Sequence, residues 1–243
     1  MRNLIILLLL FLSSCGKDTT IVPNGKSGSL AKMISVGDYL YVIDVKDLKT
    51  FDISDNLNPI QKSVVDVGLG IETIFPFANY LFIGSREGLY IYDISNPEKP
   101  VEASAERVEH FTSCDPVVAN NNYAYVTLSS VSVDCRVGEL NELQVVDIQD
   151  IFKPVVIKKI PMQGPKGLGL DGDKLFICDS DLGVVVFDLL DPDAPTVITT
   201  LSGFTANDVI VDNGRLLVVC DDGLRQFNYT NIDSIYQISH LSL

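Results

Sequence analysis

The sequence predicts an all-β fold built from repeated units, and three observations carry this prediction. A short block that ends a strand with Asp or Asn recurs five times along the 243 residues. Each unit contains about four apolar, β-branched or aromatic stretches separated by polar turns, which is the pattern of short strands. No stretch after the leader has a convincing helical period. Such units favour a β-propeller of about five four-stranded blades, because one blade cannot bury both of its faces alone.

The chain begins with a segment that is typical of an export signal. A basic start, Met1-Arg2-Asn3, precedes an unbroken apolar run over residues 4–12. As a helix this run spans about 14 Å, whereas a bilayer core needs about 20 residues, so it predicts a signal peptide. Leu12-Ser13-Ser14-Cys15 resembles the lipobox of bacterial lipoproteins. The resemblance implies cleavage after residue 14 and lipidation of Cys15; the alternative is an ordinary secretory signal with a nearby cysteine.

Residues 15–28 are predicted to form a lipidated, flexible tether. The segment is polar, rich in Gly, Ser and Thr, and has no periodicity. Several acyl chains on one residue give stable membrane anchoring, whereas a single chain is marginal. Gly16 is not acidic, and by resemblance to proteobacterial sorting rules this favours the outer membrane. Whether the domain faces the periplasm or the cell surface stays open.

The repeat occupies residues 29–243. Its marker residues are spaced by 41, 54, 41 and 40 positions, and they are Asp52, Asp93, Asp147, Asp188 and Asn228. The predicted blades cover about residues 29–68, 69–110, 111–163, 164–203 and 204–243. The second unit shows its four strands well, and they are residues 71–78, 80–84, 89–94 and 101–108. A period near 40 with all-β units is typical of propeller blades.

The units resemble LVIVD-repeat proteins, a bacterial propeller family often found as exported lipoproteins. The resemblance rests on the core Leu-x-Ile/Val-x-Asp-Ile-Ser-Asp/Asn-Pro-x-x-Pro and on the strand before it, as in Tyr39-Leu-Tyr-Val and Tyr123-Ala-Tyr-Val. Four units match well, and the fifth carries Asn228 in place of Asp and lacks the Pro pair. The family implies a propeller fold and little about activity.

The recurring Asp is interpreted as a structural turn residue. Its carboxylate can accept hydrogen bonds from backbone N–H groups two residues on, and Asn228 can do the same. The alternative is a metal site, for which Asp171-Gly-Asp173 and Asp179-Ser-Asp181-Leu-Gly183 are only fragments of a calcium loop. We therefore predict no metal and no cofactor.

A binding site is predicted at one mouth of the central channel. The entry to each first strand shares an end of the blade with the loop between the second and third strands. Counting back from each marker gives a ring of mixed charge, which consists of Lys32, Glu72, Asp115, Lys166, Asn207 and Asp208. Polar groups that converge on a concave mouth form the default ligand-binding hypothesis. The alternative is a solvated loop rim.

The third unit carries an insertion over the same mouth. It is longer by 13 residues, most of them between Tyr125 and Leu143, and we expect a ligand between residues 129–142, which include Arg136, and the mouth. An exported chain meets an oxidising compartment, so Cys114 and Cys135 are predicted to form a disulfide; two free thiols are the alternative. Cys178 and Cys220 lie in apolar runs and are expected to be buried thiols.

The amino-acid composition argues against several classes of function. A formal charge of −14 argues against nucleic acid and against docking on anionic lipid through a basic patch. His110 and His240 are the two histidines, and neither stands in a recognisable triad or zinc setting. The favoured function is a non-catalytic module that binds an envelope or extracellular protein or glycan. The alternatives are a channel-mouth hydrolase or lyase using Glu72, Asp115 and Asp208, with or without calcium, and a structural partner in an envelope assembly.

Overall fold

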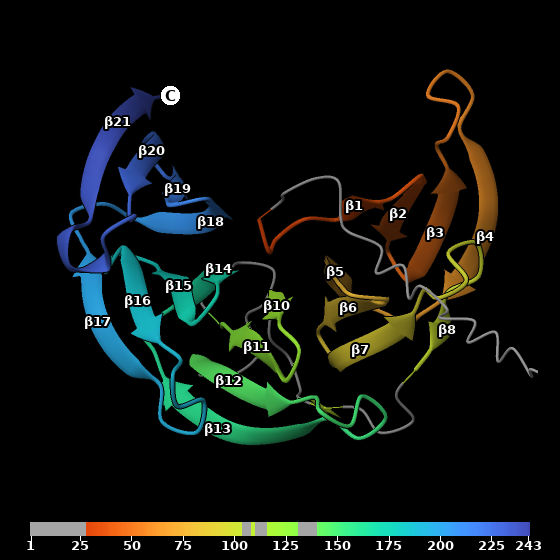
Figure 1. Cartoon of the computed structure of the whole chain (residues 1–243), viewed down its shortest axis with the longest axis horizontal. Coiled ribbons are helices and arrows are strands. Elements are labelled where there is room, and N and C mark those ends of the chain that lie inside the picture. The colour runs from red at the N-terminus through yellow and green to blue at the C-terminus, as the bar shows by residue number, and fades with distance from the viewer. Residues whose placement is uncertain (1–27, 104–107, 110–115, 131–139) are drawn as a thin grey trace, which may run out of the picture.

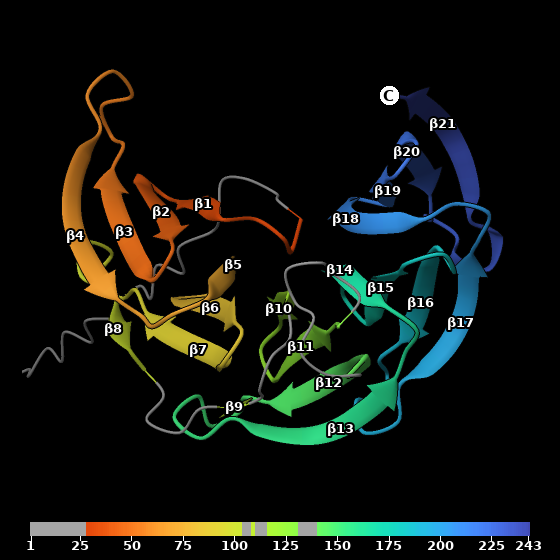
Figure 2. The same cartoon turned by 180° about the vertical axis from the view of Figure 1, so that it is seen from behind.

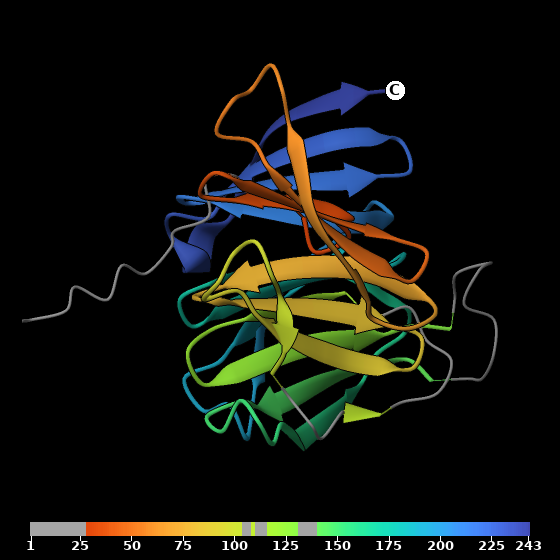
Figure 3. The same cartoon turned by 90° about the vertical axis from the view of Figure 1, so that its right-hand side faces the viewer.

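The computed structural model describes residues 28–103, 108–109, 116–130 and 140–243. Five antiparallel sheets follow one another in an open arc around a common axis, which confirms the predicted five-bladed propeller (Figures 1 and 2). Figure 3 shows the sheets of the first three blades stacked on one another. The described residues contain one short 3-10 turn, η2 (Ile232–Ser234), and no helix in them is long and apolar enough to cross a membrane.

Each blade is one consecutive stretch of chain. Blade 1 consists of β1 (Met33–Val36), β2 (Tyr39–Asp44), β3 (Asp47–Asp52) and β4 (Ile60–Asp66). Blade 2 consists of β5 (Ile71–Phe77), β6 (Tyr80–Ser85), β7 (Gly88–Asp93) and an outer strand in two pieces, β8 (Val101–Glu102) and β9 (Val108–Glu109). Blade 3 consists of β10 (Val117–Ala119), β11 (Tyr123–Leu128), β12 (Glu142–Asp147) and β13 (Val155–Pro161). Blade 4 consists of β14 (Pro165–Asp171), β15 (Lys174–Asp179), β16 (Val184–Asp188) and β17 (Thr196–Leu201). Blade 5 consists of β18 (Ala206–Asp212), β19 (Arg215–Cys220), β20 (Gly223–Asn228) and β21 (Tyr236–Ser242).

The marker residues end the third strand of every blade and hold the turn that follows. In each case the marker side chain accepts a hydrogen bond from the backbone N–H two residues on. The distances are 3.0, 2.6, 2.9, 2.9 and 3.0 Å for Asp52, Asp93, Asp147, Asp188 and Asn228. The repeat keeps Asp or Asn at this position because both side chains carry an oxygen that can accept this hydrogen bond.

Local sequence also fixes the hairpins. The turn between β18 and β19 is Asn213-Gly214, with φ values of 47° and 80°. Both central residues of a type I′ turn need positive φ, which Asn and Gly adopt most readily. The flanking strands are rich in Val, Ile and Leu, which suit a pleated, half-buried surface.

The core lies between the blades. Each sheet has a leading face toward the next blade and a trailing face toward the previous one. Four apolar clusters join blades 1 and 2, 2 and 3, 3 and 4, and 4 and 5. At the last of these boundaries, Phe176 of β15 contacts Tyr229 with ring centroids 4.8 Å apart. Among the described residues no such cluster joins blade 5 to blade 1.

Residues 28–32, here called the strap, connect the two ends of the arc near the axis. The strap leads into β1 and reaches blades 4 and 5 (Figure 1). The hydroxyl of Ser29 accepts a hydrogen bond from the backbone N–H of Leu168, and Ala31 accepts one from Ile74 of blade 2 at 2.9 Å. The strap contains no strand, and β21 completes the sheet of blade 5.

Candidate functional site

The mouth is the end of the propeller where first strands begin and second strands finish. Arg86, which follows β6, lies with its Nε 2.8 Å from Oε1 of Glu72 in β5. The amide nitrogen of Asn207 in β18 donates to Oδ1 of Asp221, which follows β19, at 2.7 Å. These contacts place strand entries and the loops between second and third strands at one end of their blades.

A row of three polar side chains crosses the boundary between blades 4 and 5 at the mouth. The ammonium of Lys166 in β14 donates to Oδ1 of Asn207 at 2.5 Å, and Asn207 in turn donates to Asp221. Lys166 is half-buried, and no carboxylate among the described residues forms an ion pair with it. The row therefore presents a positive charge that a neutral amide holds in place.

Asp208 neighbours this row but serves the strap. Its carboxylate accepts hydrogen bonds from the backbone N–H groups of Val209, Leu30 and Ser29, and lies 3.5 Å from the Ser29 hydroxyl. Burial raises the pKa of Asp208 to about 6, against the opposing effect of these hydrogen bonds. Because its oxygens already have partners within the chain, Asp208 contributes to the mouth mainly by holding it together.

The remaining predicted ring residues are distributed unevenly. Glu72 is paired with Arg86, so its charge is locally balanced. Lys32 is exposed, and its backbone carbonyl accepts a hydrogen bond from Ile43 at 2.9 Å. Asp115 and Arg136 lie outside the described residues, as do the predicted Cys114–Cys135 disulfide and the lipidation site Cys15. Cys178 and Cys220 are free and buried, and burial raises the pKa of both thiols.

Sequence reasoning missed several mouth residues, because they follow strands whose ends it did not align. Arg86 and Asp221 follow the second strands of their blades and pair with ring residues that were predicted. Asp179 is buried at the end of β15 and accepts the backbone N–H of Gly164 at 2.6 Å. A repeat alignment extended to the end of each second strand would have indicated them.

Two acids of the calcium-loop fragments have hydrogen-bond partners elsewhere in the fold. Asp181 accepts a hydrogen bond from the Thr205 hydroxyl at 2.8 Å, and Asp171 accepts one from the Tyr229 hydroxyl at 2.8 Å. No group of three or more His, Cys, Asp or Glu side chains suited to a metal ion occurs in the part of the chain that the structure describes. Asp171 and Asp181 therefore act as hydrogen-bond acceptors within the fold.

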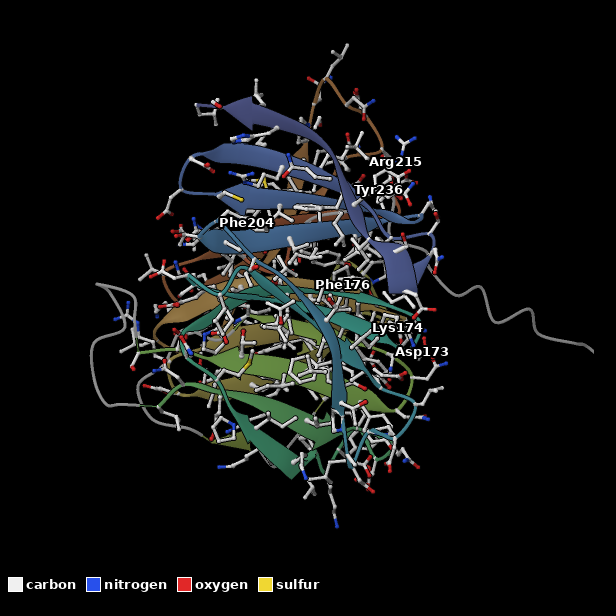
Figure 4. The ribbon with its side chains drawn as sticks, turned by 90° about the vertical axis from the view of Figure 1, so that its left-hand side faces the viewer. Asp173, Lys174, Phe176, Phe204, Arg215 and Tyr236 are labelled. Carbon is white, nitrogen blue, oxygen red and sulfur yellow. The ribbon has the colours of Figure 1, made fainter. Side chains whose placement is uncertain are left out.

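A hollow of about 450 Å³ opens at the end opposite the mouth, between blades 4 and 5. Figure 4 shows Asp173 and Lys174 at this end, away from Phe204. The Lys174 ammonium lies 3.0 Å from Asp173 and 3.4 Å from Asp188, so the positive charge in this hollow is paired. The mouth, where Lys166 keeps an unpaired charge, is the stronger candidate site.

A model of the LVIVD repeat matches residues 28–67 and 77–105. No curated protein matches the sequence.

Solved structures match over most of the chain at low identity. They include the periplasmic gluconolactonase PpgL of Pseudomonas aeruginosa (16% identity, TM-score 0.64, covering 85% of this chain and 68% of that one). BamB of Moraxella catarrhalis matches with 14% identity and a TM-score of 0.60, covering 90% and 62%. A functionally unknown protein of Desulfotomaculum acetoxidans DSM 771 matches with 12% identity and a TM-score of 0.66, covering 85% and 67%.

The similar structures are longer than this chain, which spans 60% of the length of the first of them, the computationally designed protein Ika8. At these identities the likeness concerns the fold alone. The recurring Asp blocks, the five sheets around one axis and the match to the repeat model agree. The chain is a five-bladed β-propeller that contains LVIVD repeats.

Proposed function

We propose that the protein is an exported, lipid-anchored β-propeller that binds an envelope or extracellular protein or glycan at its mouth without catalysing a reaction. The observation that carries the binding site is the row Lys166–Asn207–Asp221, in which an unpaired ammonium is held between two blades. Rigid blades position such a group at little entropic cost on binding.

The anchoring part of the proposal rests on the leader. An apolar run over residues 4–12 is followed by Leu12-Ser13-Ser14-Cys15 and a polar tether up to the strap. Among the similar structures, the gluconolactonase is described as periplasmic, which is compatible with an envelope location for this chain. The net charge of −14 does not favour nucleic acid.

Anchoring is tested in bacterial cells with radiolabelled palmitate. The wild-type chain should incorporate palmitate and sediment with membranes, whereas Cys15→Ser should lose the label and be recovered in the soluble fraction. Cys220→Ala changes a cysteine of β19 and serves as the matched control, which should behave as wild type. Membrane recovery of unlabelled Cys15→Ser would contradict a lipid anchor.

Binding at the mouth is tested by cross-linking the protein to intact envelopes and comparing Lys166→Gln with Lys153→Gln. Lys153 is exposed in a turn away from the mouth, so Lys153→Gln removes the same charge at a different place on the surface. We expect Lys166→Gln to weaken recovery of the cross-linked partner and Lys153→Gln to leave it unchanged. Equal recovery with both variants would rule out Lys166 as a contact. If the purified wild-type protein hydrolyses a lactone and Glu72→Gln abolishes this hydrolysis, the protein is an enzyme, and the proposal of a non-catalytic binding module is wrong.

A further inference from the structure

In the part of the chain that the structure describes, no blade lies against the leading face of blade 5 or the trailing face of blade 1, and together these two faces are called the seam. Figures 1 and 2 show these two sheets at the ends of the arc. Side chains of β19 alternate between the two faces of blade 5. Leu216 and Val218 are fully buried against blade 4, whereas Leu217 and Val219 are 37% and 36% exposed on the seam.

In the other blades, the residues equivalent to those of the seam are buried against a neighbouring blade. Phe82, Tyr125 and Phe176 occupy the position of Leu217 in blades 2, 3 and 4, and all three are completely buried against the following blade. On the other wall, Phe51 is half-buried, while its equivalent Tyr92 is 3% exposed. The seam therefore has the apolar chemistry of an inter-blade interface but lacks the covering sheet.

Arg215 adds a charge to the seam. It lies on the same face of β19 as Leu217, at the end of blade 5 shown in Figure 4, and no described carboxylate pairs with it. In blade 1 the equivalent residue is Tyr39, whose hydroxyl donates to Oε1 of Glu98 in the following blade at 3.4 Å. In blade 4 it is Lys174, which pairs within its own blade with Asp173 at 3.0 Å and with Asp188 at 3.4 Å. Asn228 stands opposite Arg215 where Asp188 stands opposite Lys174, so among the described residues Arg215 has neither the carboxylate of its own blade that Lys174 has nor the one from a following blade that Tyr39 has.

The geometry points to the seam as a docking surface for a β-sheet of another polypeptide, one that presents an apolar face to Leu217 and Val219 and a carboxylate to Arg215. Sheet faces of this kind pack on other sheet faces at a separation of about 10 Å. The strap bonds Ser29 to Leu168 and Asp208, so the inner ends of both walls are already held in place.

A second copy of this chain fits the seam less well. Its trailing faces on blades 2 to 5 are covered, which leaves the trailing face of its blade 1. In blade 1 the position equivalent to Glu98 is Leu57, so Arg215 would meet an apolar side chain. Charge complementarity therefore favours a different sheet, and this inference does not depend on the mouth.

The test supplies a sheet of known chemistry by appending a second copy of residues 164–243 after Leu243. The first appended blade brings a trailing face like that of blade 4 and places Asp193 at the position of Glu98. The measured quantity is the rate at which a thiol reagent labels the cysteine introduced by Leu217→Cys. The labelling of the same chain without this substitution is subtracted. Val155→Cys, on the outer strand of blade 3 and 55% exposed in the native residue, is the matched control.

We expect the appended blades to slow labelling at position 217 by roughly tenfold or more and to leave position 155 unchanged. Arg215→Glu should restore fast labelling in the extended chain, and Asp193→Lys in the appended copy should slow it again. Unchanged labelling at position 217, or appended blades that remain sensitive to protease, would overturn the proposal. A parent chain that dimerises with position 217 protected would assign the seam to a second copy and overturn it as well.

Discussion

The hydroxyl oxygen of Ser29 accepts a hydrogen bond from the backbone N–H of Leu168 at 2.7 Å, across 139 positions of the chain. Ser29 precedes blade 1, and Leu168 belongs to β14 of blade 4. The same hydroxyl lies 3.5 Å from Asp208 of blade 5. Since no apolar cluster among the described residues joins blades 5 and 1, these polar contacts connect the ends of the arc.

Ser29→Ala should destabilise the fold. The change leaves the buried N–H of Leu168 without its acceptor, and a buried unsatisfied group costs about 1–3 kcal/mol. Urea unfolding should show a lower midpoint with little change in slope. Ser239→Ala removes an exposed hydroxyl whose hydrogen bond to Gln226 is 3.4 Å long, and it should be close to neutral. Equal effects of the two variants would mean that the strap does not hold the ends.

Asp208 should make stability depend on pH. Its pKa is raised from 3.8 to about 6, so the folded state holds a proton that the unfolded state has released between these values. The contribution of Asp208 to stability is therefore fully present below pH 3.8 and is lost as pH rises through 6. At 1.36 kcal/mol for each pKa unit, the loss is about 3 kcal/mol.

Asp208→Asn removes this titration. We expect the free energy of unfolding of the variant, measured relative to that of the wild type, to rise by about 3 kcal/mol between pH 3 and pH 7. Asp55→Asn is the control with the opposite sign, because hydrogen bonds from Asn58 and Leu57 lower the pKa of Asp55. A difference between Asp208→Asn and wild type that stays constant with pH would contradict the burial of this carboxylate.

The fold was predictable because its signals are local and repeated. Each marker residue accepts a hydrogen bond from two residues on, so the five blocks could be aligned without tertiary knowledge. The same alignment indicated Lys166, Asn207 and Asp208, which the structure brings together. The strap was not predictable, because the contact between Ser29 and Leu168 leaves no periodic trace in the sequence. The pairing of Arg86 with Glu72 depends on the length of a loop, which strand patterns do not give.

The marker Asp residues should be replaceable by Asn but not by Ala. Asn228 already fills this position in blade 5 and accepts the Thr230 N–H at 3.0 Å. Asp188→Asn should therefore keep the acceptor for the Leu190 N–H, although it weakens the ion pair with Lys174. Asp188→Ala loses both, and we expect its melting temperature to fall by several degrees more. Similar melting temperatures for the two variants would show that the turn does not need this acceptor.

Leu216 and Leu217 form a matched pair that tests whether the seam is covered in solution. Leu216 is fully buried against blade 4, so Leu216→Ala should cost about 2–5 kcal/mol through lost burial and the cavity it leaves. Leu217 is 37% exposed on the seam, and Leu217→Ala should cost under about 1 kcal/mol in the isolated protein. Chemical denaturation of both variants gives the two values directly. If Leu217→Ala proves as destabilising as Leu216→Ala, the leading face of blade 5 must already be packed against another sheet.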